Sequence, residues 1–327
     1  GRKLRSDTTV VESNVHYPTD SASLGDGMRV LTRCLKRIAH ECQSGAVAVV
    51  DHARAAKHRL LEISRAAKSL TEAGQQRMQQ SYQQLLALTR SVVRQASGVL
   101  DGWAAKSLPV AGNLLRVETQ MGQLRHFLPL VQKVIAQTQE RICQGNRHVV
   151  GKVLSLFEPH TQAIRKGKAH KPTEFGRLVR LDEVENGIVS HYQVLEGNPA
   201  DTNAWTPALT QHQAYFGRPP RMATADRGYF SADNERGAQA RGVEKVALPA
   251  RGRLSQSRAR YQKQRWFRRA LRWRAGIEGT ISTLKHPFSM LRATYKGDTG
   301  FQRYVGWSVI TKNLFSIARF LVRRGDA

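Results

Sequence analysis

Carboxylates and basic residues meet in two short stretches of this sequence. Glu278 lies in RAGIEGTISTLK, four residues after Arg274 and seven before Lys285. In a helix these steps return to nearly the same face, so the three side chains should point the same way. Asp226 ends the stretch MATAD, which is typical of a short buried strand, and Arg227 follows it. Acids in such a basic setting could hold a metal ion against a phosphate that the bases attract.

Each acid also has an ordinary structural explanation. Arg274 and Glu278 could form an i,i+4 ion pair worth roughly 0.2–0.5 kcal/mol. Asp226 could cap a turn, and Asp7 could be a strand-end acid of no special role. Taken together, the three acids suit Mg²⁺ or Mn²⁺, which prefer hard oxygen ligands. Two such ions activate a nucleophile and stabilise the leaving oxygen of a phosphodiester.

The charge of the chain favours a polyanion as its partner. The 327 residues include 52 Lys+Arg against 25 Asp+Glu, a formal net charge of +27. Phosphates that bind such a surface release counterions, so nucleic acid is the expected partner and an acidic membrane surface the weaker alternative. No apolar run approaches the roughly 20 residues of a membrane-spanning helix. Hydrophobic residues make up 40% of the chain, enough for a folded core.

The cysteines and the first residue give two further expectations. Cys34, Cys42 and Cys143 form no CxxC pair, which argues against structural zinc and a disulfide framework. A reducing, cytoplasmic compartment fits best. The sequence begins at Gly1 and enters a strand almost at once, so we expect an N-terminal region to be missing.

The first half of the chain predicts one strand and a helical block. Residues 4–15 are rich in Thr and Val, as strands are. From 28 to 151, apolar residues recur at three- and four-residue steps, which predicts long antiparallel helices. Breaks are expected near Gly74, residues 98–102 and residues 108–112.

The second half alternates strands and helices. Asn186–Gly187 is expected to join two strands as a hairpin. Short strands and helices should follow, ending with helices at 255–285 and 301–322, the last with Trp307 and Phe315 facing the core. This order favours an α/β fold, a mixed sheet flanked by helices with an all-α insertion after the first strand. The expected division is a first strand in 1–20, a helical insertion in 21–160 and the rest of the sheet fold in 161–327.

Motifs in three places resemble the DDE transposases of bacterial insertion sequences, which have an RNase H-like catalytic core. The family carries Y-x2-R-x3-E-x6-K, and this chain has R-x3-E-x6-K from Arg274 to Lys285, with Leu271 in place of the tyrosine. ADRGYFS around Asp226 resembles the second motif, and DTTVVESNVHYPTDSASL, beginning at Asp7, resembles the first. KGKAHKPTEFG, LEGNPAD and QRWFRRALRWRAGIEGTISTLK also look like this family. The resemblance covers nearly the whole chain outside the helical block.

The resemblance implies that Asp7, Asp226 and Glu278 are catalytic residues that bind two Mg²⁺ ions, with Mn²⁺ as a substitute. Glu158 and Asp182 are rivals for the first acid. Asp7 is preferred because an RNase H-like sheet carries its first acid on its first strand. Asp182 is expected to face solvent, since its strand alternates with polar residues.

The resemblance also implies double-stranded DNA as the partner, both the terminal repeats of the element and the target. Self-association is expected when two ends are paired, in a bacterial cytoplasm close to the nucleoid. Residues expected to contact DNA are Arg274, Lys285, Arg227, Lys166, Lys168, Lys171, Arg265, Arg268 and Arg269. The missing tyrosine removes one substrate-positioning contact, and the expected missing N-terminal region is what commonly binds terminal repeats. The helical insertion could pair two copies, clamp DNA or simply pack on the core.

Two functions from different classes follow. The first is an enzyme that cleaves DNA at element ends with metal ions and then transfers the freed strand. The second is an inactive, truncated transposase remnant that acts only as a basic DNA-binding protein. An RNA-binding protein is less consistent, because no RRM- or KH-like motif is present. Metal-dependent nicking that disappears in Asp226→Ala would separate the first two.

Overall fold

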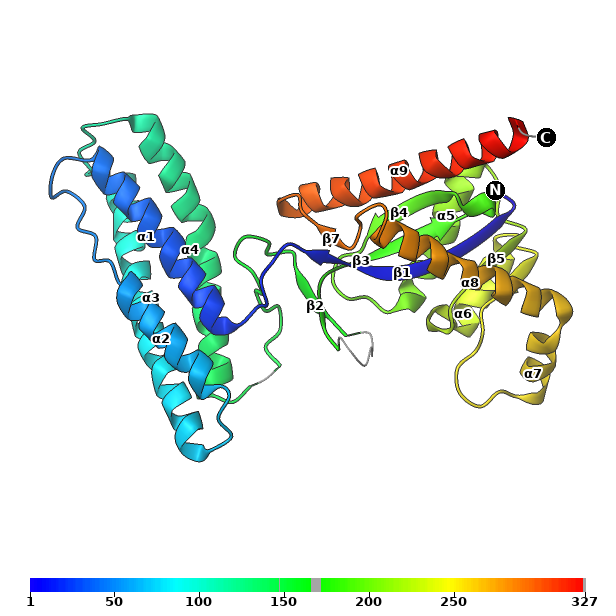
Figure 1. Cartoon of the computed structure of the whole chain (residues 1–327), viewed down its shortest axis with the longest axis horizontal. Helices are drawn as coiled ribbons and strands as arrows, with labels where there is room; N and C mark the ends of the chain where they lie inside the picture. Colours follow the sequence, from blue (N-terminus) through cyan, green and yellow to red (C-terminus); the bar gives the residue numbers. More distant parts are fainter. Residues whose placement is uncertain (147, 166–171, 326–327) are drawn as a thin grey trace. The chain divides into compact units, whose positions relative to one another are not determined.

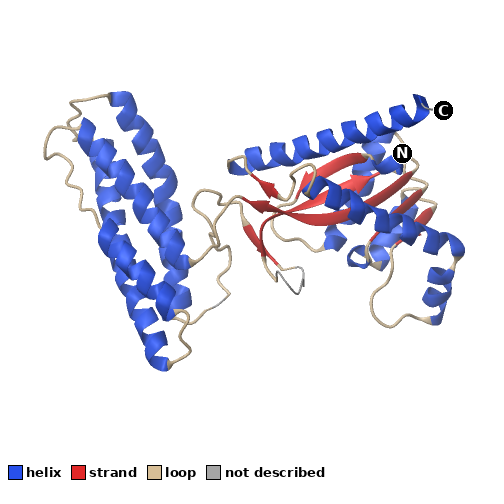
Figure 2. Ribbon diagram, viewed as in Figure 1, coloured by secondary structure: helices blue, strands red, loops and turns tan. Residues whose placement is uncertain are grey.

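The structure, a computed structural model, describes residues 1–146, 148–165 and 172–325, and the chain forms two compact units (Figures 1 and 2). The sheet unit comprises Gly1–Asn14 and His160–Ala327, and the helical unit comprises Val15–Pro159. Within the described residues, every helix is too short or too polar to cross a bilayer.

The helical unit is built from long helices around one apolar core. Its α-helices are α1 (Asp20–Glu41), α2 (Ala53–Ala66), α3 (Glu72–Ala104) and α4 (Leu114–Cys143). Leu31, Leu85 and Val131, from α1, α3 and α4, are fully buried in that core. The expected breaks near Gly74 and at 108–112 are confirmed, because the chain leaves the helix between α2 and α3 and again between α3 and α4. The break expected at 98–102 is wrong, because these residues lie inside α3. A glycine inside a helix costs only about 1 kcal/mol, which core packing readily overrides.

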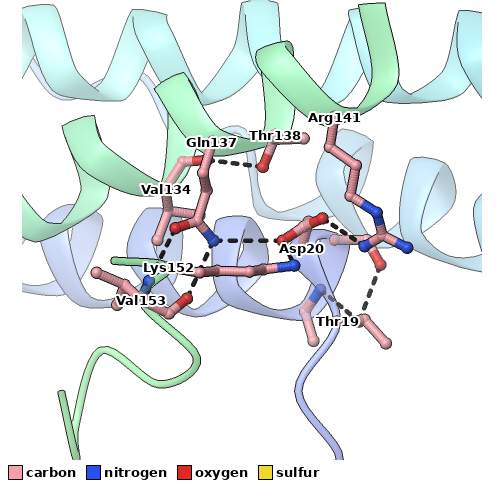
Figure 3. Close-up of polar contacts among 10 residues, drawn as sticks. Thr19, Asp20, Val134, Gln137, Thr138, Arg141, Lys152 and Val153 are labelled. Atoms are coloured by element: carbon pink, nitrogen blue, oxygen red, sulfur yellow. Dashed lines mark hydrogen bonds and ion pairs between the residues drawn. The ribbon is translucent and has the colours of Figure 1, made fainter. Parts of the chain in front are cut away.

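Buried Asp20, the first residue of α1, ties three segments of the helical unit together (Figure 3). Its carboxylate pairs with Arg141 at 2.6 Å and with Lys152 at 2.8 Å. Gln137 donates one hydrogen bond to Asp20 and another to the backbone carbonyl of Val153. Burial acts to raise the pKa of Asp20, but the hydrogen bonds and charges of Lys152 and Arg141 outweigh it and hold the pKa below its usual value. The carboxylate is therefore ionised and fully paired in the folded unit.

The described residues of the sheet unit form a seven-stranded mixed sheet of RNase H-like order. Its strands are β1 (Lys3–Ser13), β2 (Gln162–Ile164), β3 (Glu174–Glu183), β4 (Val189–Val194), β5 (Met222–Ala225), β6 (Lys245–Ala247) and β7 (Arg292–Ala293). The order is β2-β3-β1-β5-β6, with β4 also beside β3 and β7 beside β1. β3 runs antiparallel to β1, whereas β5 runs parallel to it. The predicted hairpin forms, and Asn186 and Gly187 lie in its turn with φ of 62° and 74°. The turn is longer than the two residues expected, because residues 184–188 join β3 to β4.

Helices cover both faces of this sheet (Figure 1). They are α5 (Trp205–Phe216), α6 (Ala232–Ala240), α7 (Gln256–Lys263), α8 (Arg265–Lys285) and α9 (Gly297–Gly325). On one face, Leu4 of β1 is buried with Trp205 of α5. On the other face, Val11 of β1 is buried with Leu284 of α8 and Val305 of α9. The single helix expected over 255–285 is two helices, because the chain is extended at Gln264, with ψ of 142°.

The orientation expected for α9 is wrong. Trp307 is 60% exposed and Phe315 is 51% exposed, whereas Phe301, Val305 and Val309 are buried against the sheet. This helix has apolar residues on more than one side, so its sequence alone does not indicate which side packs. Trp307 and Phe315 turn out to lie on an exposed side.

Candidate active site

Asp7 and Asp226 come together through the register of two neighbouring parallel strands. The β1–β5 ladder pairs Arg5 with Thr224 and Ser6 with Ala225. One further step places Asp7 beside Asp226, which still has extended backbone angles, at a Cα separation of about 5 Å. Matching positions on adjacent strands project from the same face of a sheet. Two carboxylates that are far apart in sequence therefore share one face and one row.

That face is covered by α8, and Arg5 holds the helix in place. Arg5 donates to the backbone carbonyl of Trp273 and pairs with the fully buried carboxylate of Glu183. Its guanidinium carbon lies 4.8 Å from the centre of the Trp273 ring. Gly276 makes room for this contact, because a Cβ there would stand 2.5 Å from Arg5 Nη1. Arg5 is two residues from Asp7, so it fixes α8 on the face where Asp7 projects.

Arg274 of α8 connects the first and third acids. Its Nη2 donates to Glu278 Oε1 at 2.7 Å, and its Nη1 lies 3.9 Å from Asp7 Oδ2. The i,i+4 ion pair, one of the two explanations open from the sequence, therefore forms. The Arg274 side chain is 18% exposed and that of Glu278 is 67% exposed. The arginine thus stands between a partly buried acid on β1 and an exposed acid on the helix.

Asp226 caps the turn that follows its strand, beside an acid that sequence reasoning missed. Its Oδ1 accepts a hydrogen bond from the Gly228 N–H at 2.6 Å. A Cβ at Gly228 would stand 2.7 Å from Asp201 Oδ2, 2.8 Å from Asp226 Oδ1 and 3.1 Å from an Arg251 nitrogen. Asp201 is in turn bound by the Thr8 hydroxyl at 2.9 Å. The only signal for Asp201 was its stretch LEGNPAD, which carries no spacing to Asp226 that predicts contact.

Tyr229 of the same turn is fully buried, with its hydroxyl unpaired within the described structure. Its ring packs edge-on against Trp205, with centroids 6.2 Å apart. Burial raises the pKa of Tyr229 well above its usual value, and the negative charges of Asp7, Asp182 and Asp201 raise it further. The phenol is therefore neutral, and it packs beneath the acids instead of lying on the surface.

Of the two rivals for the first acid, Asp182 lies on the neighbouring strand β3 and Glu158 in the helical unit. Asp182 is buried, contrary to expectation, because it accepts a hydrogen bond from Ser6 at 2.7 Å and pairs with Arg180 at 3.0 Å. With both of these partners, Asp182 has a structural role beside β1. Glu158 belongs to the helical unit, where it is buried and its N–H donates to Ser155 Oγ.

The family model described as a transposase DDE domain matches residues 151–314. The chain belongs to that family. No curated protein and no solved structure matches it. The matched range includes Asp226, Arg274, Glu278 and Lys285 but not β1, so Asp7 rests on the sheet register instead. Membership indicates transposase-type nuclease activity, DNA as a partner and a divalent metal as cofactor.

Arginines of this DDE domain line the outer side of α8. Phe267 and Ala270 are buried against the sheet, and three of the arginines expected to contact DNA, Arg265, Arg268 and Arg269, are exposed. Arg227 is also exposed, and its carbonyl accepts a hydrogen bond from Arg251 at 2.9 Å. Lys285 is half-buried in the last turn of α8. Lys166, Lys168 and Lys171 lie outside the described residues.

Carboxylate oxygens are the ligands that a hard divalent cation prefers, but the three acids are not close enough together to hold one. Asp7 and Asp226 supply carboxylate oxygens on one face, and the positive guanidinium of Arg274 already stands between Asp7 and Glu278. In the part of the chain that the structure describes, no three His, Cys, Asp or Glu side chains are close enough to hold a metal ion. Glu278 would have to leave Arg274 to complete a three-carboxylate site.

Proposed function

We propose that this protein is a transposase that cleaves DNA at the ends of its insertion sequence and transfers the freed 3′ ends to a target. Asp7, Asp226 and Glu278 are the catalytic carboxylates in this proposal. The observation that supports it is the register of β1 and β5, whose continuation by one residue would align Asp7 with Asp226 on the face that α8 covers. The helix that bears Glu278 is fastened to that face by Arg5.

The three carboxylates would hold Mg²⁺ or Mn²⁺, two ions per site, which when bound activate the attacking hydroxyl and stabilise the leaving oxygen. Side chains of the protein itself would hold Glu278 and position the DNA. Arg274 keeps Glu278 near Asp7 before substrate arrives. A phosphate that enters the site competes for this arginine, because guanidinium binds phosphate and carboxylate alike. The exposed arginines of α8, together with Lys285 and Arg227, position the DNA backbone.

The alternative function is that of an inactive DNA-binding remnant. It is favoured by one observation, namely that the described acids do not gather into a three-ligand site. Both functions predict DNA binding that weakens with salt, since both rest on a net charge of +27. Only the transposase predicts metal-dependent strand cleavage.

The test is nicking of a supercoiled plasmid with and without Mg²⁺ or Mn²⁺. Asp226→Asn keeps a side chain that can cap the Gly228 turn but removes the charge that a metal needs. We expect at least about a 100-fold loss of nicking, because loss of a direct ligand should cost no less than loss of its supporting partners. Asp233→Asn is the matched control, since its side chain is 86% exposed on α6. Absence of metal-dependent nicking in the unmodified protein, or full activity of Asp226→Asn, would favour the remnant.

A further inference from the structure

Thr8 and Gly228 orient the carboxylates of the first two proposed catalytic acids. The Thr8 N–H donates a hydrogen bond to Asp7 Oδ1 at 2.8 Å. The Gly228 N–H donates to Asp226 Oδ1 at 2.6 Å. Each contact joins a carboxylate to the backbone one or two residues further along the chain. The direction in which each carboxylate points therefore depends on where Thr8 and Gly228 lie.

The side chain of Asp201 contacts both of these orienting residues. Its Oδ1 accepts a hydrogen bond from the Thr8 hydroxyl at 2.9 Å. Its Oδ2 lies against Gly228, where an added Cβ would stand only 2.7 Å from it. The same Cβ would stand 2.8 Å from Asp226 Oδ1, so the carboxylates of Asp201 and Asp226 approach each other at this glycine. One side chain thus links the strand that carries Asp7 to the turn that carries Asp226.

The backbone of the Asp201 segment is itself fastened to the Asp226 turn. Asp201 begins the short 3₁₀ helix η2 (Asp201–Ala204). The side-chain amide of Asn234 in α6 donates to the backbone carbonyls of Thr202 and Tyr229, at 2.8 Å each. Bonds from one amide to two segments hold those segments at a fixed separation. Asp201 therefore acts on Thr8 from a base that is already joined to the second acid's turn.

Asp201 supports the acids from the other face of the sheet. Side chains alternate along a strand, so Thr8 projects from the face opposite to Asp7. Asp201 binds the Thr8 hydroxyl on that face, whereas α8 covers the face of Asp7. Asp201 is therefore not placed to bind the same cation as Asp7. A carboxylate that holds the residues behind metal ligands is instead a supporting partner, of the kind that orients ligands.

We propose that Asp201 is a positioning residue of the metal site. Through Thr8 and Gly228 it holds the carboxylates of Asp7 and Asp226 in the mutual arrangement that binds a divalent cation. This inference rests on the proposed function, in which those two acids hold the cation. Supporting partners of metal ligands contribute roughly 10- to 100-fold to metal affinity. Loss of Asp201 should therefore weaken metal binding although its side chain does not touch the ion.

The experiment measures Mn²⁺ binding to the full chain without DNA, from the electron paramagnetic resonance signal of free Mn²⁺. Asp201→Ala removes the acceptor of the Thr8 hydrogen bond, and Thr8→Val removes its donor. Each should raise the Kd for Mn²⁺ at least about tenfold. Because both changes break one interaction, the double variant should bind Mn²⁺ no more weakly than Asp201→Ala alone. Asp233→Ala is the matched control and should leave the Kd unchanged, since its side chain is 86% exposed on α6.

Asp201→Asn separates positioning from direct binding of the ion. The amide oxygen of asparagine still accepts the Thr8 hydrogen bond, although the side chain has lost its charge. We therefore expect a Kd for Mn²⁺ within about threefold of that of the unmodified protein. Asp226→Asn is the comparison, because it alters a proposed ligand. It should weaken Mn²⁺ binding far more than Asp201→Asn does.

Three results would overturn the positioning role: an Mn²⁺ affinity that Asp201→Ala leaves unchanged, equal losses in Asp201→Ala and Asp201→Asn, or additive losses in the double variant. Urea unfolding is measured for each variant, because a purely structural role would lower stability and leave the Kd of the folded protein unchanged. Absence of Mn²⁺ binding by the unmodified protein would also overturn the positioning role.

Plasmid nicking by the same proteins decides the proposed function separately. Mn²⁺ binding that depends on Asp201, in an unmodified protein that does not nick, would contradict the transposase and leave the positioning role standing. Nicking by the unmodified protein, with Mn²⁺ binding that does not respond to Asp201→Ala, would support the transposase and contradict the positioning role.

Discussion

Replacing Gly276 by alanine tests whether Arg5 positions the helix that carries Glu278. A Cβ at this position would stand 2.5 Å from Arg5 Nη1 and 3.3 Å from its Cζ. Real Cβ atoms do not approach other atoms so closely, so either Arg5 or α8 must move. Arg5 is not free to move cheaply, because it is 7% exposed, lies against Trp273 and pairs with the fully buried Glu183.

The magnitude follows from two opposed effects. Alanine in place of a helical glycine gains about 1 kcal/mol. Loss of the buried hydrogen bond and ion pair of Arg5 costs roughly 3 kcal/mol. We therefore expect Gly276→Ala to lower the free energy of unfolding by about 2 kcal/mol. A shift of α8 by about 1 Å should lower metal-dependent nicking on the order of 100-fold.

Gly279→Ala is the matched control, three residues along the same helix and next to Glu278. A Cβ at Gly279 meets no other atom within 4 Å. This variant should be more stable than the unmodified protein by about 1 kcal/mol, with nicking unchanged. The assays are urea unfolding followed by circular dichroism and plasmid nicking at fixed Mg²⁺. If Gly276→Ala matched Gly279→Ala in both assays, Arg5 would not position the helix.

Two predictions concern the response to acid. The pKa of Asp20 is held below its usual value, so its contribution to stability is present above about pH 4 and is lost as the pH falls through the folded-state pKa. Asp20→Asn should lower the free energy of unfolding by about 2–3 kcal/mol at pH 7, because Arg141 and Lys152 then lose a buried partner, whereas Asp101→Asn on the surface should change it little in the same urea titration. Burial lowers the pKa of His212 from 6.5 to about 4. The sheet unit should therefore lose up to about 3 kcal/mol as the pH falls from 6.5 to 4, and His212→Leu should remove this slope in unfolding curves measured across that range.

Motifs and periodicity predict the fold class well, because they reflect local chemistry. The hairpin at Asn186–Gly187 needs positive φ at two successive residues, which this pair adopts easily. The residue types and their spacing likewise predicted the strand that ends at Asp226 and the arginine-rich helix. The positions of Asp226, Arg274 and Glu278 on these elements follow directly.

Contacts between distant segments could not be predicted in the same way. Asp201 reaches the Asp226 turn only because Thr8 binds it from β1, and nothing in LEGNPAD specifies that partner. Asp182 was expected to face solvent because polar residues alternate along its strand. It is instead buried, and its carboxylate forms an ion pair with Arg180 from the same strand. The exposed side of α9 was missed because apolar residues occur around much of that helix, and periodicity does not say which side packs.

The geometry of the acids is a property of the sheet unit alone. Extending the β1–β5 register by one residue puts Asp7 beside Asp226, and Arg5 holds α8 on the sheet. None of these residues lies in Val15–Pro159, which has an apolar core of its own. The cost of closing a loop grows only slowly with its length, so a self-sufficient unit can interrupt the chain after β1 without weakening the sheet much. This explains how Asp7 can lie more than 200 residues before Asp226 in sequence and still share one face of the sheet with it.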